Sequence, residues 1–138
     1  MELKEVVLIY NIDDRKRYLL YENFFSSHQV ELKEVTEAES SVPLGFLAYG
    51  SEEQKAGYNI PGVLPAEPMM VFAGFTNQRL RLMLDGLKSK GLTEASLKAV
   101  LTEHNAVWDS ATLYEQLAEE RALFARNSNN QQEPPSRS

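Results

Sequence analysis

Hydrophobic and polar residues follow one another in two similar blocks along the chain. Val6–Glu37 and Met70–Glu103 each contain an apolar run, a polar helix-start signal, an amphipathic helix and a short second strand. The two apolar runs are long enough for strands buried on both faces. The repeat therefore predicts two strand–helix–strand units in one small domain.

The first unit has clear boundaries. We expect, in order, a strand at Val6–Tyr10, a helix near Arg15–Ser27 and a charged edge strand at Val30–Val35. Asp13 or Asp14 precedes the helix, where a carboxylate accepts hydrogen bonds from free backbone N–H groups. We favour this capping role for the pair over Mg²⁺ binding.

The second unit repeats the first with different end signals. We expect a strand at Met69–Phe75 and a helix that begins after Thr76 and ends at Gly91. A fourth strand is predicted at Leu97–Leu101. Asp109 then caps a last helix that reaches about Ala125. The polar tail that follows predicts a single α+β domain over 1–126 and a disordered segment over 127–138.

The segment between the two units is unusually long for a small domain. Pro43–Tyr49 is apolar and predicts a brief helix with Pro43 in its first turn. Gly50–Pro68 is rich in glycine, proline and charge and predicts a long loop. Loops of this length are usually functional or mobile.

Two strand–helix–strand units most simply predict an α+β, ferredoxin-like βαβ-βαβ sandwich, with an added C-terminal helix and a long loop between the second and third strands. The first and third strands then lie in the centre. The alternative is an α/β three-layer sheet of parallel strands, which requires Pro43–Tyr49 to serve as a crossover helix.

The two central strands have two apolar faces. In the predicted arrangement both repeat helices cover one face, and a second set of side chains lies on the other face: Val7, Ile9, Met70 and Phe72. An exposed apolar patch of this kind is larger than monomers usually tolerate. We expect the last helix or a second copy of the protein to cover it.

Composition limits the classes of function. The net charge is −6, which opposes nonspecific binding to nucleic acid. The chain has no cysteine, so disulfides and thiolate chemistry are excluded. It begins with no signal-peptide pattern and contains no apolar run of transmembrane length. These features predict a cytoplasmic protein that binds neither nucleic acid nor membranes.

Candidate chemistry concentrates after the fourth predicted strand. Loops at strand ends often carry function, and Glu103 beside His104 is suited to acid–base work. Adjacent residues tend to point apart, however, and the repeat does not bring the other histidine, His28, near them. We therefore assign no catalytic residue and no metal site from the sequence.

The stretch Leu97–Trp108, followed by Leu113 and Leu117–Arg121, resembles a small bacterial family known only as a domain of unknown function, the 3783 family. The likeness extends over about Met69–Glu120. The resemblance implies no activity. If the family pattern marks a site, the matching positions are Lys98, Thr102, Asn105 and Trp108.

These observations predict a non-enzymatic ligand-binding or regulatory interaction module, with no cofactor. Its expected partners are a small molecule, a protein, or further copies of itself in a homo-oligomer. The predicted site lies where the long loop meets the end of the fourth strand, and its candidate residues are Lys98, Thr102, Glu103, His104, Asn105 and Trp108. The alternative is a small enzyme that uses Glu103 or His104 at the same place.

Overall fold

The structure is a computed structural model that describes residues 3–58 and 60–131, the last four by their backbone alone. In these residues the strands are β1 (Val6–Tyr10), β2 (Glu31–Glu34), β3 (Met69–Ala73) and β4 (Leu97–Val100). The α-helices are α1 (Arg15–Ser27), α2 (Leu44–Tyr49), α3 (Glu52–Ala56), α4 (Asn77–Ser89) and α5 (Ser110–Gln131), and a 3-10 turn covers Glu37–Glu39. No helix in the described residues is long and apolar enough to cross a membrane.

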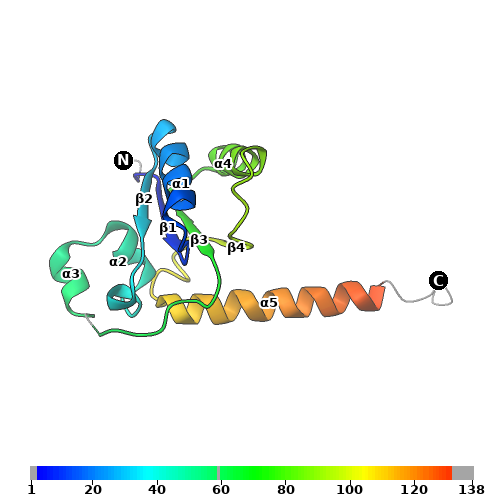
Figure 1. Cartoon of the computed structure of the whole chain (residues 1–138). Coiled ribbons are helices and arrows are strands. Elements are labelled where there is room, and N and C mark those ends of the chain that lie inside the picture. Colours follow the sequence, from blue (N-terminus) through cyan, green and yellow to red (C-terminus); the bar gives the residue numbers. More distant parts are fainter. Residues whose placement is uncertain (1–2, 59, 132–138) are drawn as a thin grey trace.

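The four strands form one mixed sheet in the order β2-β1-β3-β4 (Figure 1). Each strand–helix–strand unit keeps its own two strands side by side and parallel. The two units meet where β1 runs antiparallel to β3, with Leu8 opposite Val71. A local two-fold axis through the centre of the sheet therefore relates the two halves of the repeat.

The α+β class and the central position of β1 and β3 are confirmed, but the ferredoxin-like topology is not. In a ferredoxin-like sheet another strand separates the two strands of each unit. Here each helix packs over its own adjacent strand pair, and the units join antiparallel. The alternative of an all-parallel sheet does not describe the fold either, although helices do cover both faces.

The local signals in the repeat were read correctly. Asp14 caps α1 by accepting hydrogen bonds from two backbone N–H groups, as predicted for the Asp13–Asp14 pair. The Thr76 hydroxyl accepts from the Arg79 N–H and begins α4. Gly91 ends it with φ +72°, a conformation that glycine adopts without strain.

The α1 and α4 helices cover one face of the sheet. Their buried side chains include Phe25 and Met83, which belong to one core cluster with Val7 and Ile9 of β1 and with Phe72 of β3. The alternation of the strands was predicted correctly, but the assignment of faces was wrong: the set containing Val7 and Ile9 lies under the repeat helices. Strand periodicity separates two sets of side chains without saying which set a helix will cover.

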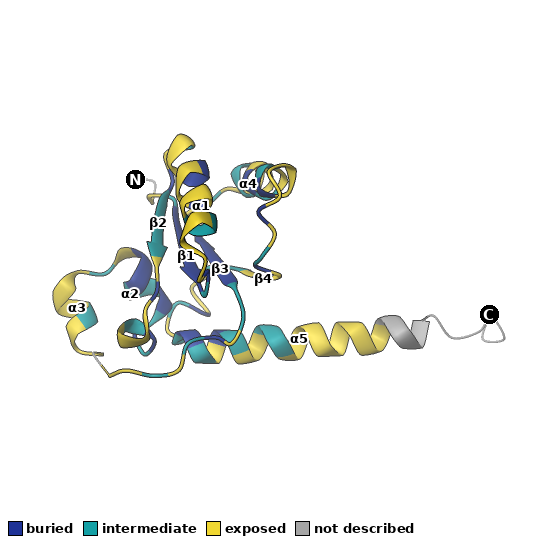
Figure 2. Ribbon diagram, in the orientation of Figure 1, coloured by how far each residue is buried: buried dark blue, intermediate teal, exposed yellow. Residues whose placement is uncertain are grey.

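The opposite face is covered by α2 and the beginning of α5 (Figure 2). Leu44 and Leu47 of α2 and Leu113 of α5 are buried against Leu8 and its neighbours. A buried hydrogen bond of 2.7 Å joins the Tyr10 hydroxyl to the Ser110 hydroxyl and fixes the start of α5 at the end of β1. The last helix thus covers part of this face, as expected.

Two predictions for the rest of the chain need correction. α2 has the bounds expected of the brief helix after Pro43, but a further helix, α3, occupies the start of the predicted long loop. α5 continues to Gln131, into the segment 127–138 that was predicted to be disordered. The remainder of that segment, 132–138, lies outside the described residues.

Candidate functional site

Two of the predicted site residues build the turn after β4. Asn105 is buried, and its side-chain oxygen accepts a hydrogen bond of 2.8 Å from the Thr102 N–H. The Thr102 hydroxyl accepts from the Asn105 N–H over 3.2 Å, and the Asn105 amide donates to the Val100 carbonyl over 3.0 Å. Because these polar groups already have partners, their observed role is to hold the turn.

Three further predicted residues lie on or beside this turn without converging. Glu103 and His104 are exposed. The His104 ring meets Trp108 edge-on, with ring centroids 5.2 Å apart. Trp108 is half-buried and packs against the core under α2 and α5. The pair predicted for acid–base work therefore sits at the surface rather than in an enclosed pocket.

Lys98 lies on the other side of the sheet. It pairs with Met70, which belongs to the core under α1 and α4. Its Nζ atom donates to the Ala95 carbonyl over 2.6 Å, and burial of the side chain lowers the pKa of Lys98. It borders a hollow of about 350 Å³ next to α4. The six predicted residues therefore do not form one site.

The turn after β4 is joined instead to the start of α2. The Leu44 N–H donates to the Trp108 carbonyl over 2.8 Å, and the Gly45 N–H donates to the Ala106 carbonyl over 2.9 Å. The first N–H groups of a helix have no partner within it, so this turn caps α2. A Cβ atom at Gly45 would lie 3.2 Å from the Ala106 Cβ, and a larger side chain would push the segments apart.

An apolar groove of about 450 Å³ opens beside this junction. Phe46 and Tyr49 come from α2, Tyr58 follows α3, and Val107 belongs to the turn after β4. Val107 is 75% exposed and Tyr58 is 42% exposed, values high for such large apolar groups. The groove therefore lies where the long connection meets the end of β4, the place predicted from the sequence, although its lining residues are different.

The walls of the groove are held by contacts outside it. The Tyr49 hydroxyl donates to the Lys4 carbonyl over 2.7 Å. This contact passes close to Gly74, whose φ is +83° and where a Cβ atom would lie 2.6 Å from the Tyr49 oxygen. Lys33 donates to two carbonyls at the end of α2 over 3.1 and 3.3 Å. These contacts hold α2, and with it one wall of the groove, against the sheet.

The lining of the groove suits binding better than acid–base chemistry. The Phe46 and Tyr58 rings are tilted towards each other, with centroids 6.0 Å apart. Gln54 and Tyr58 are lining residues with polar side-chain groups, and the described residues place no carboxylate, imidazole or amine in the lining. Aromatic walls with a few polar groups are typical of sites that bind an apolar or aromatic group.

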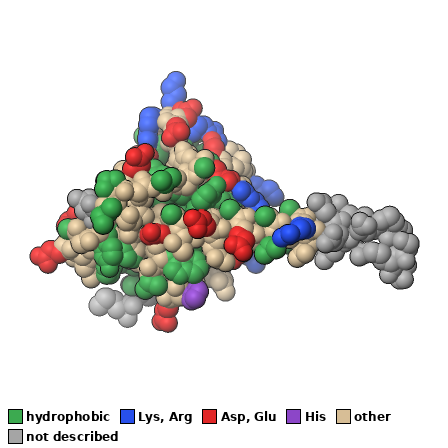
Figure 3. Space-filling view, turned by 90° about the horizontal axis from the view of Figure 1, so that it is seen from below, with side chains coloured by type: hydrophobic (Ala, Val, Ile, Leu, Met, Phe, Trp, Pro, Cys, Tyr) green, Lys and Arg blue, Asp and Glu red, His purple; other side chains and the backbone are tan. Residues whose placement is uncertain are grey.

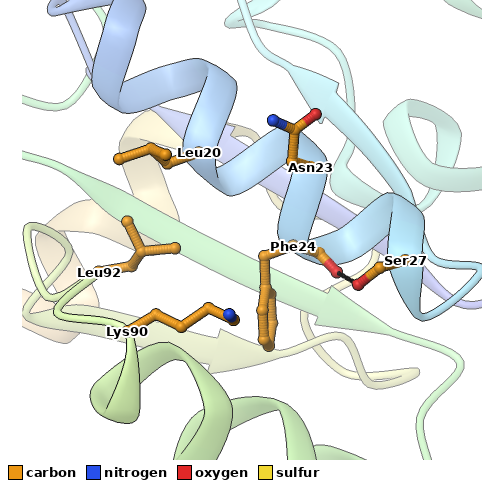
Figure 4. Close-up of a pocket in the computed structure, with 6 residues that line it drawn as sticks. All are labelled: Leu20, Asn23, Phe24, Ser27, Lys90 and Leu92. Atoms are coloured by element: carbon orange, nitrogen blue, oxygen red, sulfur yellow. Dashed lines mark hydrogen bonds between the residues drawn. The ribbon is translucent and has the colours of Figure 1, made fainter.

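A second, smaller hollow of about 290 Å³ lies on the opposite face of the molecule (Figure 4). Leu20, Phe24 and Leu92 line it, and the Lys90 side chain extends across it. It sits between α1 and the end of α4, within the symmetric part of the repeat. With one aromatic ring and a smaller volume, it offers less apolar surface than the groove beside α2.

The carboxylates with the largest pKa shifts belong to ion pairs that hold the fold together. Hydrogen bonding from Arg121, and then from Tyr114, lowers the pKa of Glu67 to about 2 and ties α5 to the segment before β3. Arg17 and then Tyr21 lower the pKa of Glu94 to about 2 in the same way. Within the described residues, no group of three or more His, Asp and Glu side chains is placed to hold a metal ion.

The groove residues were not among those predicted from the sequence. Phe46, Tyr49 and Tyr58 were read as parts of a helix or a loop, and Val107 as part of a turn. The available signal was the number of aromatic residues in the long connection, where a purely solvated loop would be polar. These residues meet Val107 because backbone hydrogen bonds join the start of α2 to the turn after β4. Hydrogen bonds between segments so far apart in the sequence cannot be predicted from a local pattern.

Residues 68–124 match a family model described as Domain of unknown function (DUF3783). This match confirms the resemblance seen in Leu97–Trp108, and it carries no activity. The DUF3783 match includes β3, α4, β4 and most of α5, whereas α2 and α3 lie before it. One wall of the groove, Val107, is therefore inside the matched segment and the aromatic walls are outside it. No curated protein and no solved structure matches the chain.

Proposed function

We propose that this protein is a non-enzymatic, cytoplasmic binding module of a regulatory kind, and that it takes up an apolar or aromatic group of its partner in the groove between α2 and the turn after β4. The observation that carries the proposal is the groove itself. It exposes Val107 and Tyr58 at a junction that backbone hydrogen bonds hold rigidly.

The arrangement of polar groups supports binding over catalysis. Thr102 and Asn105 are engaged in turn hydrogen bonds, and Glu103 and His104 are exposed next to the groove rather than inside it. A general acid or base must come within hydrogen-bond reach of its substrate in a defined site. The enzyme that uses Glu103 or His104 stays an alternative prediction with less support.

Binding of the neutral, environment-sensitive fluorescent dye 6-propionyl-2-(dimethylamino)naphthalene tests the proposal. We expect the wild-type protein to enhance the dye fluorescence saturably. Val107→Glu places a charge at the mouth of the groove and should weaken dye binding by about tenfold or more, since an unpaired charge is costly next to apolar walls.

The matched control is Leu20→Glu, which places the same charge in the smaller hollow beside α1. We expect it to leave dye binding within about twofold of the wild type, a difference well below 1 kcal/mol. Equal dye binding by Val107→Glu and wild type would overturn the assignment of the groove. Thermal unfolding of both variants establishes that they are folded.

A further inference from the structure

The second half of α5 extends away from the rest of the protein (Figures 1 and 2). The last side chain of its described part that forms an ion pair or hydrogen bond with the body is Arg121, which pairs with Glu67 over 2.8 Å and donates to Ser96 over 3.3 Å. All residues from Glu119 to Asn127 are exposed. Isolated helical segments of this length are only marginally stable in water, so a partner for this arm would stabilise it.

The arm carries an apolar anchor. Leu113 and Leu117 lie on the side of α5 that packs against the body, and Phe124 continues the same stripe about two turns beyond Leu117. Phe124 is 74% exposed and Leu123 is 43% exposed. An aromatic side chain on a projecting helix is the kind of group that an aromatic-lined groove accepts.

The groove of the same molecule is out of reach of this anchor. Val107 lines the groove just before α5 begins at Ser110. Phe124 lies about 21 Å further along the helix axis, at 1.5 Å per residue. Because α5 runs straight away from the body, Phe124 can enter the groove of another molecule only.

The end of the arm next to Phe124 carries a positive charge, whereas carboxylates lie near the groove. Glu119, Glu120 and Arg121 lie at the base of the arm, where Arg121 is paired with Glu67, and Arg126 is the one charged residue from there to Asn127. Near the groove, Glu52 and Glu53 lie at the start of α3, and Glu103 lies in the turn after β4. Figure 3 shows hydrophobic side chains over the end of the molecule that holds α2 and α3, whereas most Lys and Arg side chains lie elsewhere on this face.

We propose that the groove binds Phe124 from the α5 arm of a second copy of this chain. This inference rests on the proposed function of the groove and names its occupant. When each of two copies places its Phe124 in the groove of the other, both grooves are filled and the result is a closed, two-fold symmetric dimer. The partner's Phe124 thus completes a site that is open in the isolated chain.

The area involved predicts a weak dimer. An aromatic side chain buries about 150–250 Å², so two anchors with their helical flanks remain below the roughly 1,200–2,000 Å² of a stable interface. The dimer should therefore dissociate on dilution. A reversible dimer of this kind leaves the groove available to a competing partner.

Engineered cysteines test the arm exchange directly, because the natural chain contains none. Val107→Cys and Ala125→Cys are prepared separately and mixed under mild oxidation, with Phe124 intact in both. We expect the mixed disulfide to exceed by severalfold the mixed disulfide between Ala125→Cys and Leu82→Cys. Leu82 is half exposed on α4, in the layer that lies across the sheet from the groove, and serves as the control.

Sedimentation velocity and dye binding separate the two proposals. Wild type and Leu82→Glu should dimerise with rising concentration, whereas Phe124→Glu should remain monomeric and bind the dye at least as well. Equal cross-linking of both mixtures together with a monomeric wild type would overturn the arm exchange. If that monomer still bound the dye at Val107, the groove would serve a small molecule or another protein; if it did not, the proposed function would fail as well.

Discussion

The two faces of the sheet are covered in different ways. On one face α1 and α4 occupy equivalent places in the two halves of the repeat, and their side chains form a continuous core. On the other face α2 comes from the long connection and α5 from the end of the chain. The symmetric face has the character of a scaffold, and the asymmetric face holds the larger groove.

The comparison shows where a repeat leaves room for function. Each unit ends in Thr-Glu, at Thr36-Glu37 and Thr102-Glu103, and the chain then diverges. The two divergent segments return to the same face and meet, with Gly45 bonded to Ala106. The groove forms at this meeting point because neither segment has a symmetric counterpart to pack against.

The largest expected effect lies on the symmetric face. Phe25 is fully buried and its ring packs edge-on against Phe72, with centroids 6.3 Å apart. Phe25→Ala should lower the free energy of unfolding by about 3–5 kcal/mol, since it removes a large core side chain and leaves a cavity. Urea unfolding measures the loss.

The matched change on the asymmetric face is Leu113→Ala. Leu113 is buried, but it belongs to the first turns of a helix that soon leaves the body. We expect a loss near the lower end of about 2–5 kcal/mol. A larger loss at Leu113 than at Phe25 would contradict the view that the symmetric face is the main scaffold.

The next effect distinguishes structural from ligand-binding roles in the turn after β4. Asn105→Ala removes the partners of the Thr102 N–H and the Val100 carbonyl. The expected loss of unfolding free energy is about 1–3 kcal/mol, the cost of leaving such groups unpaired. Urea unfolding provides the measurement, and an unchanged midpoint would speak against the structural role.

His104→Gln is the control for this experiment, because His104 is exposed and makes no side-chain hydrogen bond to the described residues. It should change the unfolding free energy by less than about 0.5 kcal/mol. Dye binding should also persist. If His104→Gln alone abolished dye binding, the binding site would have to include the residues predicted from the sequence.

The last predicted effect is a pH dependence on the symmetric face. The pKa of Glu94 is lowered from 4.5 to about 2, mainly by the hydrogen bond from Arg17. In the unfolded chain Glu94 takes up a proton below its ordinary pKa, whereas in the folded protein it stays charged. Its stabilising contribution is therefore present above pH 4.5 and is lost as the pH falls towards about 2.

Glu94→Gln tests this dependence. The variant should be less stable than the wild type above pH 4.5, and the difference should shrink as the pH falls through that range. Unfolding by urea at a series of pH values gives the two curves. Parallel curves would show that the ion pair with Arg17 contributes no pH-dependent stability.

Much of the scaffold could be predicted because its signals are local. The bounds of β1 and α1, the caps at Asp14 and Thr76 and the stop at Gly91 all follow from neighbouring residues. Strand pairing could not be predicted in this way. Whether β1 lies next to β2 or to β4 depends on contacts between distant residues, and the same apolar pattern fits several sheet orders.

The candidate site residues predicted from the sequence differ from the residues that line the groove. The prediction that function lies where the long connection meets the end of β4 agrees with the position of the groove. The polar residues of the turn were predicted to bind a ligand because their side chains can form hydrogen bonds. In the structure the Asn105 side chain forms its hydrogen bonds with the backbone of the turn instead. Val107 became a candidate only once tertiary contacts had brought it next to Tyr58.

Amide chemical shifts test the central claim most directly, that the asymmetric face binds an apolar group. The dye is titrated into ¹⁵N-labelled Phe124→Glu protein, in which no arm competes for the groove. We predict that the largest shifts occur at Gly45, Gly50 and Val107, with little change at Ser27 and Leu92 beside the smaller hollow. Shifts concentrated at Ser27 and Leu92, or scattered over the surface, would contradict the account.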